Sequence, residues 1–214
     1  MWYLDNINVV RSEDSKKKKS ATAYKEYFSV MNLTAEQLRR RIKMAKELED
    51  ALFMLFLAWF YEADNDEAEE RFINKYLDTV EKYDDVGLED DFVEYIVLLA
   101  TSLYNSTMSN KDDPYFTSYD RATFVAANEA NTAMNKIEYA EAVKGGMTKK
   151  TWHTEQDLRV RFTHVPHDGE TIPIDEPFNI GGVLMMHPKD YFTDSGNFAL
   201  GRETINCRCH LTYS

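Results

Sequence analysis

The sequence predicts an α+β protein: a mainly α-helical N-terminal bundle followed by a small α+β C-terminal domain with a few short strands. Two observations lead to this fold class. Between residues 34 and 110, helix-forming residues dominate, and apolar residues recur three and four positions apart, as on one face of a helix. Residues 151–214, by contrast, contain all five histidines, both cysteines and most of the glycines and prolines. Frequent glycines and prolines are typical of short strands joined by turns.

The composition is that of a folded, acidic protein. Hydrophobic residues make up 43% of the 214 residues and aromatic residues 13%, which is enough to form a core. The net charge is −12, and residues 61–100 alone carry fourteen acids against three bases. This acidic belt weighs against a free-standing nucleic-acid-binding protein, because phosphate contacts need a basic surface. It is either a solvated helix surface or a docking surface for a basic partner.

Residues 1–33 are predicted to form a flexible N-terminal arm. Its run Lys16–Lys19 could contact DNA or an acidic partner, or it could simply be solvated. The first residues lack the basic and apolar regions of a secretory signal. The most apolar run, residues 51–61, is shorter than the roughly 20 residues that cross a bilayer as a helix, so no membrane partner is expected. Two cysteines do not make a disulfide framework, which favours a reducing compartment such as the cytoplasm.

Residues 34–110 are predicted to form an antiparallel helical bundle. Thr34 and Gln37 have the spacing of a capping box, in which two side chains satisfy free N–H groups at the start of a helix. Two further helices are expected, over residues 66–83 and 89–106. Residues 110–114 then form a linker, because they combine turn-forming residues with a proline.

The second domain, residues 120–214, is predicted to begin with a helix over residues 121–145. Asp120 would cap this helix at its start, and Gly145 and Gly146 would end it.

The remaining residues are predicted to form strands and turns. Short strands are expected over residues 149–153, 171–174 and 205–213. Residues 155–164 fit either a short helix ended by Pro166 or a strand, and the helix fits better. Residues 178–190 are expected to be mostly loop.

The pair Cys207 and Cys209 is the sharpest chemical feature. On a strand the two side chains would share one face with their Cα atoms about 6.6 Å apart, near the outer limit for a disulfide. The spacing therefore favours a metal site or two free thiols over a bond between them. The candidate zinc ligands are His164, Cys207 and Cys209, with one of His153, His167 or Asp168 as a fourth. His210 would face away from Cys209. The alternative is that the two cysteines are small buried apolar residues.

A catalytic site is a second interpretation of the same region. In a small metal-dependent nuclease or toxin-like enzyme using His164, Asp168, Cys207 and Cys209, Asp168 would orient His164, Arg161 would stabilise an anion and Glu129 would supply another carboxylate. Alternatively, Arg161, Asp168 and Glu129 pair with one another and hold the small domain on its leading helix. The sequence shows no nucleophile beside a base and no phosphate-binding loop, so a protein without catalytic activity is favoured.

The order of several short motifs carries a family resemblance. They are Arg121, Glu129 and Asn135, then Trp152, Arg161 with His164, Asp168-Gly169, Asp175-Glu176-Pro177-Phe178, Pro188 with Asp190, and Asn206-Cys207-Arg208-Cys209. In this order they resemble the C-terminal domain of phage Mu protein F-like minor head proteins, over roughly residues 120–213. His210 and Asn128 depart from the pattern, because the family usually has a small hydroxyl or aliphatic residue and a threonine there.

The resemblance implies a phage minor head protein that acts in head morphogenesis. Such proteins are made in the host cytoplasm, join the interior of the virion capsid, associate with a portal, scaffold or capsid protein, and can enter the cell with the DNA. The helical N-terminal part would be specific to the partner, and direct contact with DNA stays open. Related domains are sometimes joined to toxin or nuclease-like modules, so the resemblance keeps an enzyme as an alternative. A third alternative is an acidic binding module unconnected with phage.

Overall fold

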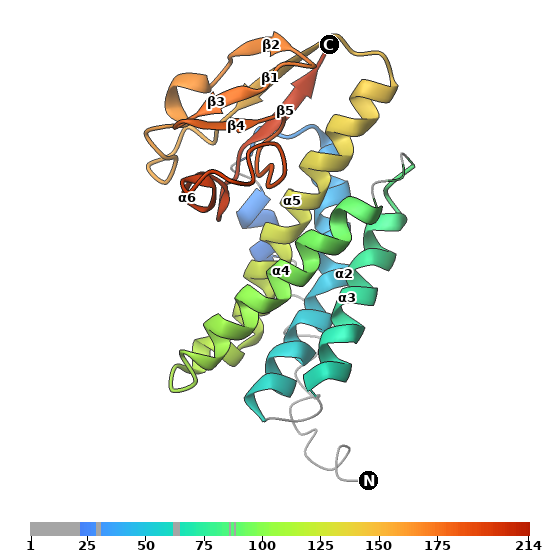
Figure 1. Ribbon diagram of the computed structural model, residues 1–214, viewed down its shortest axis with the longest axis vertical. Helices are drawn as coiled ribbons and strands as arrows, with labels where there is room; N and C mark the ends of the chain where they lie inside the picture. Colours follow the sequence, from blue (N-terminus) through green and yellow to red (C-terminus); the bar gives the residue numbers. More distant parts are fainter. Residues whose placement is uncertain (1–21, 29–30, 62–64, 86, 88) are drawn as a thin grey trace.

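The computed structural model describes residues 22–28, 31–61, 65–85, 87 and 89–214 (Figure 1). Long helices fill one end of the molecule, and short strands gather at the other end beside the C-terminus. The predicted α+β fold class is therefore confirmed. None of the helices in the described part of the chain is both long enough and apolar enough to cross a membrane.

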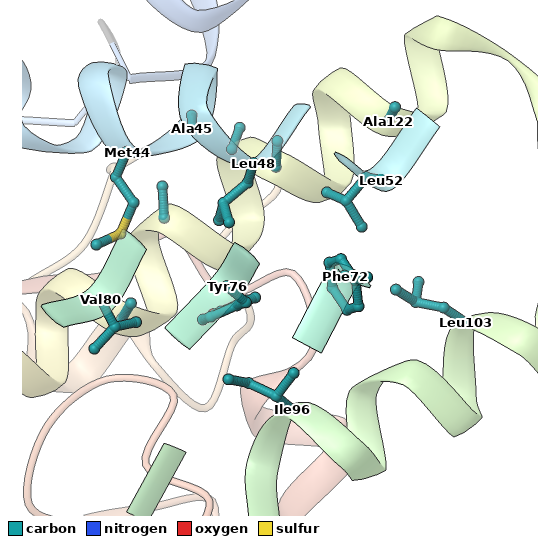
Figure 2. Packing of buried hydrophobic residues seen from close by; sticks show 14 of the residues in the cluster. Met44, Ala45, Leu48, Leu52, Phe72, Tyr76, Val80, Ile96, Leu103 and Ala122 are labelled. Carbon is teal, nitrogen blue, oxygen red and sulfur yellow. The ribbon is translucent and has the colours of Figure 1, made fainter. Parts of the chain in front are cut away.

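Four long helices within the described residues form the bundle. They are α2 (Ala35–Phe60), α3 (Asn65–Glu81), α4 (Glu89–Met108) and α5 (Tyr119–Lys144). Apolar side chains from all four meet in one core, and Figure 2 shows Leu48 of α2, Tyr76 of α3, Ile96 of α4 and Ala122 of α5 turned toward it. Alanines line the buried face of α5, so this helix can lie close to α2.

Of the two helix starts predicted from capping residues, one is confirmed and the other is wrong. The capping box is confirmed, since the Gln37 N–H donates to Thr34 Oγ1 and the Thr34 N–H donates to Gln37 Oε1. The predicted Asp120 cap of α5 is wrong. A short 3₁₀ helix, η2 (Pro114–Thr117), ends just before Ser118, so Ser118 is the extended residue whose Oγ accepts from the Arg121 N–H.

The predicted flexible arm of residues 1–33 is described only in part. Lys16–Lys19 lies outside the described residues. Residues 22–28 are helical, and Tyr24, Phe28 and Met31 are buried in the bundle core. Packed structure is therefore present before the capping box of α2.

The C-terminal end contains two small antiparallel sheets. The first has the order β2 (Thr171–Pro173), β1 (Lys149–His153), β5 (His210–Tyr213), and the second pairs β3 (Phe178–Ile180) with β4 (Val183–Met185). A second core forms beneath them, made of Trp152, Phe178, Ile180, Val183, Met185, Cys207, Cys209 and Leu211. The strands predicted near β1 and β2 are thus confirmed.

The predicted helix over residues 155–164 is wrong. This segment runs as turns until the 3₁₀ helix η3 (Val165–His167), and its apolar residues Leu158 and Phe162 are exposed to solvent. Because these apolar side chains do not pack against a core, they could not stabilise a helix in this segment. The Asp157 carboxylate instead accepts from the Arg159 N–H and the Arg208 guanidinium, which holds an irregular backbone.

Two further predictions about the C-terminal region hold only in part. Residues 178–190 contain the β3–β4 hairpin, because Gly181 and Gly182 take positive φ values and close a tight two-residue turn. The last strand begins at His210, since the short helix α6 (Leu200–Thr204) and a turn at Asn206 with φ 56° precede it. Cys207 and Cys209 therefore lie in an extended segment before the strand, not on it.

A buried polar network joins the bundle to this segment. The guanidinium of Arg41 on α2 has no solvent exposure and contacts the Glu138 carboxylate on α5 at 2.6 Å. It also donates to the side-chain oxygens of Asn131 and Asn135, each at 3.0 Å. We call these four residues the Arg41 network. Arg41 lies outside the predicted C-terminal domain, residues 120–214, whereas its partners lie inside it. Residues 110–114 therefore stay a predicted domain boundary, and buried hydrogen bonds connect the two sides of it.

The Arg41 network generates the first prediction. Arg41→Met should lower the free energy of unfolding by about 3–5 kcal/mol, because it leaves the Glu138 carboxylate buried without its cation. Chemical denaturation measures this loss. The matched control is Arg39→Met, which removes an exposed pair with Glu36 and should change stability by less than about 1 kcal/mol. Equal effects of the two changes would contradict the role of the buried pair.

Candidate functional site

Three of the predicted site residues meet in the C-terminal core. The Nδ1 atom of His164 lies 3.4 Å from the Cys209 sulfur and 3.7 Å from the Cys207 sulfur. All three ligand atoms are within 4.8 Å of one another, and all three side chains are buried. We call His164, Cys207 and Cys209 the His–Cys trio. The predicted proximity of the two cysteines to His164 is therefore confirmed, and both cysteines are free thiols in this structure. The trio could bind a metal ion.

The backbone around the two cysteines is held from below by helix α5. The Asn131 side-chain amide donates to the Cys207 carbonyl at 3.3 Å, and the Asn135 amide donates to the Cys209 carbonyl at 3.1 Å. The oxygens of these two amides accept from Arg41, so each amide is fixed in one orientation. The cysteine segment is therefore anchored on α5 while its sulfurs reach the core beside Trp152.

His164 is anchored by an aromatic ring and a carboxylate. Its ring packs edge-on against Trp152, with ring centres 5.9 Å apart. Its Nε2 atom lies 3.2 Å from the Glu203 carboxylate on α6. The Glu203 side chain is fully buried and also accepts from Thr163 Oγ1 at 2.7 Å and from the Arg202 Nε–H at 3.1 Å. Burial would raise the pKa of Glu203, but these hydrogen bonds outweigh it and lower the pKa.

The pKa values of the two thiols shift in opposite directions. A hydrogen bond from Cys209 lowers the pKa of Cys207 well below its ordinary value, and His164 adds to this effect. The same hydrogen bond, together with burial, raises the pKa of Cys209. One sulfur is thus ready to carry negative charge beside the imidazole, which is an environment that attracts a cation.

The other residues predicted for a catalytic site lie elsewhere. Asp168 accepts from the Thr154 backbone and hydroxyl and from Gln156, and Arg161 donates to the Ile205 carbonyl. Glu129 is in the bundle core, where Tyr95 donates to it at 2.6 Å and Tyr76 at 3.2 Å. Each of the three is engaged with separate partners. Among the described residues, none of these three side chains is hydrogen-bonded to the His164 ring, and they do not pair with one another. Arg161 meets His164 through its backbone carbonyl, which accepts from the His164 N–H at 2.9 Å.

The histidines suggested as a fourth ligand also have other partners. His153 stacks on His210 with ring centres 5.1 Å apart and contacts Thr212 through Nε2. His167 contacts Glu170 near the surface. His210 lies on the His153 side, as the sequence predicts. Within the described residues, the metal-binding arrangement is therefore the trio alone.

A buried carboxyl group near the trio was missed by the sequence reasoning. Glu155 is almost fully buried, and neither of its carboxylate oxygens has a hydrogen-bond partner in the described part of the chain. Burial raises its pKa to about 8, and the negative charge of Cys207 contributes to the rise. A cation held by the trio would favour the ionised form of this acid.

Comparison with protein families shows which family contains this domain. The family model described as "Phage Mu protein F like protein" matches residues 101–212, slightly more than half of the chain. The chain belongs to the phage Mu protein F-like family of phage head proteins. The match includes α5, both sheets, the His–Cys trio and Glu203. It leaves out α2, so Arg41 supports the family's domain from outside the matched region.

One curated protein is a similar relative. It is the NAD(+)--arginine ADP-ribosyltransferase EFV of Enterococcus faecalis (strain ATCC 700802 / V583), which is 32% identical over 96 residues. The matched part is 43% of this Mu F-like chain but only 18% of the relative. The chain therefore spans less than a fifth of that protein's length. No solved structure gave a significant match.

The anchoring of the cysteine segment generates the second prediction. Asn135→Ala removes both the donor to the Cys209 carbonyl and an acceptor of the Arg41 guanidinium, so we expect stability to fall by about 1–3 kcal/mol. The two thiols should also react faster with a colorimetric thiol reagent, because their burial depends on this anchor. The control Asn105→Ala changes an exposed asparagine of α4 and should leave the rate unchanged. Unchanged thiol reactivity in Asn135→Ala would contradict the anchoring role.

Proposed function

We propose that this Mu F-like protein is a minor head protein that acts in head morphogenesis by binding other head proteins. Its proposed place is inside the procapsid, near the portal, from which it can leave with the DNA. The observation that carries the proposal is the family match over residues 101–212. The helical bundle then supplies the surface that is specific to this chain.

The outer faces of α3 and α4 support a protein partner. Exposed acids lie along both helices, among them Glu70 and Asp78 on α3 and Glu94 on α4. The apolar residues Val97 and Leu98 of α4 are also exposed, at 44% and 62%. A surface that mixes acids with apolar side chains suits a partner with a basic and apolar face, such as a portal, scaffold or capsid protein. It is a poor surface for DNA.

The third prediction tests this partner surface. Asp78→Lys combined with Glu94→Lys should weaken co-purification with the portal protein of the same phage at least several-fold, because both changes place positive charge against a basic face. Binding of the unchanged protein should also fall as salt rises. The control pair Asp112→Lys and Glu176→Lys reverses two exposed acids elsewhere and should bind normally. Binding that resists reversal at Asp78 and Glu94 would rule this surface out.

An enzymatic role is the competing proposal, and the relative named as an ADP-ribosyltransferase is the observation that favours it. The chain covers 18% of that protein, so the named activity can reside in the rest of it. In this chain Asp168 is engaged by Thr154 and Gln156, away from the His–Cys trio. The trio itself is buried, which leaves a substrate no approach in this conformation.

The fourth prediction separates the two roles. The purified protein should leave plasmid DNA and RNA intact in the presence of Mg²⁺, Mn²⁺ or Zn²⁺, and it should not consume NAD. Gel electrophoresis and NAD quantification measure this. Metal-dependent cleavage that disappears in His164→Ala would establish the nuclease instead.

We also propose that the His–Cys trio binds one Zn²⁺ ion that stabilises the C-terminal core. Two sulfurs and one imidazole nitrogen form a donor set that zinc prefers. Bound there, zinc would link the cysteine segment to His164 and so hold the chain's last strand in place.

A further inference from the structure

The two ring nitrogens of His164 have different surroundings. Nδ1 faces the sulfurs of Cys207 and Cys209, whereas Nε2 faces the carboxylate of Glu203. We infer that Glu203 is a positioning residue of the metal site, which accepts a hydrogen bond from Nε2 and thereby makes Nδ1 the metal-binding nitrogen of His164. This inference rests on the zinc proposal and adds a residue that the sequence did not indicate.

The tautomer of the imidazole decides which nitrogen can bind a metal. A neutral imidazole carries one N–H group, and an ionised carboxylate can only accept a hydrogen bond. Both oxygens of Glu203 accept hydrogen bonds, one from Thr163 and the other from Arg202, so this carboxylate faces the imidazole as an acceptor. The proton of His164 therefore belongs on Nε2, and the lone pair of Nδ1 points toward the two sulfurs.

Glu203 is itself held in place from several directions. Thr163, the residue before His164, donates to the same carboxylate oxygen that faces the imidazole. Arg202 donates to the other oxygen. Because the side chain has no solvent exposure, water does not compete for these bonds. The carboxylate thus fixes the direction of the imidazole and its tautomer.

Gly181 in the β3–β4 hairpin has no side chain and so leaves room for the Glu203 carboxylate. A Cβ atom placed on Gly181 would lie 2.7 Å from Oε1 and 2.9 Å from Cδ of Glu203. At the next residue, Gly182, a Cβ atom would meet nothing within 4 Å. Both glycines have positive φ values, so a side chain at either one strains the turn. Only a side chain at Gly181 also displaces the Glu203 carboxylate, and its Cβ atom would lie 3.1 Å from Cγ2 of Thr163 as well.

This pair of glycines gives a matched test that touches no metal ligand. Co²⁺ is added to metal-free protein, and the sulfur-to-cobalt absorption and the visible bands of tetrahedral cobalt report the site; Zn²⁺ competition then gives the affinity. We expect Glu203→Ala and Gly181→Ala to weaken binding about 10- to 100-fold, as for other residues that orient a ligating histidine. Glu203→Gln should recover part of the loss, because its amide oxygen can still accept from Nε2.

Two controls separate positioning from general loss of structure. Gly182→Ala carries the turn strain without the clash and should bind like the wild type. Glu170→Gln changes the exposed His167–Glu170 pair, which has the same chemistry away from the cysteines, and should also bind normally. Circular dichroism at the assay temperature confirms that each variant is folded.

The outcomes distinguish the inference from the zinc proposal. Wild-type affinity in both Glu203→Ala and Gly181→Ala, with clear wild-type binding, would overturn the role of Glu203 and leave the zinc site standing. Equal losses in Gly181→Ala and Gly182→Ala would assign the effect to the turn and overturn the link through Glu203. No stoichiometric binding by the wild type would overturn the zinc proposal and this inference together.

Discussion

The buried charge of Arg41 is the constraint on which the C-terminal half of the structure depends. A guanidinium without solvent exposure needs a full set of partners, since an unpaired charge in the interior costs several kcal/mol. Helix α5 supplies them through Glu138, Asn131 and Asn135. The side-chain oxygens of Asn131 and Asn135 accept from Arg41. The NH₂ groups of these two amides therefore point to the other side, where they can only donate. The carbonyls of the cysteine segment accept those donors.

These contacts connect the N-terminal helices to the C-terminal domain. The family match begins at residue 101 and covers the domain with the His–Cys trio. Arg41 lies on α2, outside that match, and Gln37 of the same helix also donates to the carbonyl of Leu211 in β5. The N-terminal helices therefore contribute to the support of the shared domain, in addition to the partner surface proposed for them.

The helical half of the fold was predictable because its signals are local. The capping box at Thr34 and the apolar spacing of the first three helices need no information from distant residues, and the structure reproduces them. The β3–β4 hairpin had a local signal too, the pair Gly181-Gly182, which is typical of a two-residue turn. It was missed because short strands of three residues show too little alternation.

The site was predictable only in part. His164 and the two cysteines were recognised by their ligand chemistry, although the cysteines precede the strand on which they were expected. Glu203 and Arg41 were not recognised, because an acid and an arginine on amphipathic segments are usually solvated. Their burial follows from the packing of α6 and α5, which no spacing in the sequence reveals. The helix prediction for residues 155–164 was wrong for the opposite reason, because the apolar residues on which it rested lie on the surface.

The central proposal for the site is that the His–Cys trio binds one zinc ion in the C-terminal core of this Mu F-like domain. X-ray absorption at the zinc edge, on protein purified without chelator, tests it most directly because it reads the ligands themselves. The account predicts about one zinc per chain, with two sulfur neighbours at about 2.3 Å and a histidine nitrogen at about 2.0 Å in the first shell. A shell of oxygen and nitrogen without sulfur, or protein that carries no zinc, would contradict it.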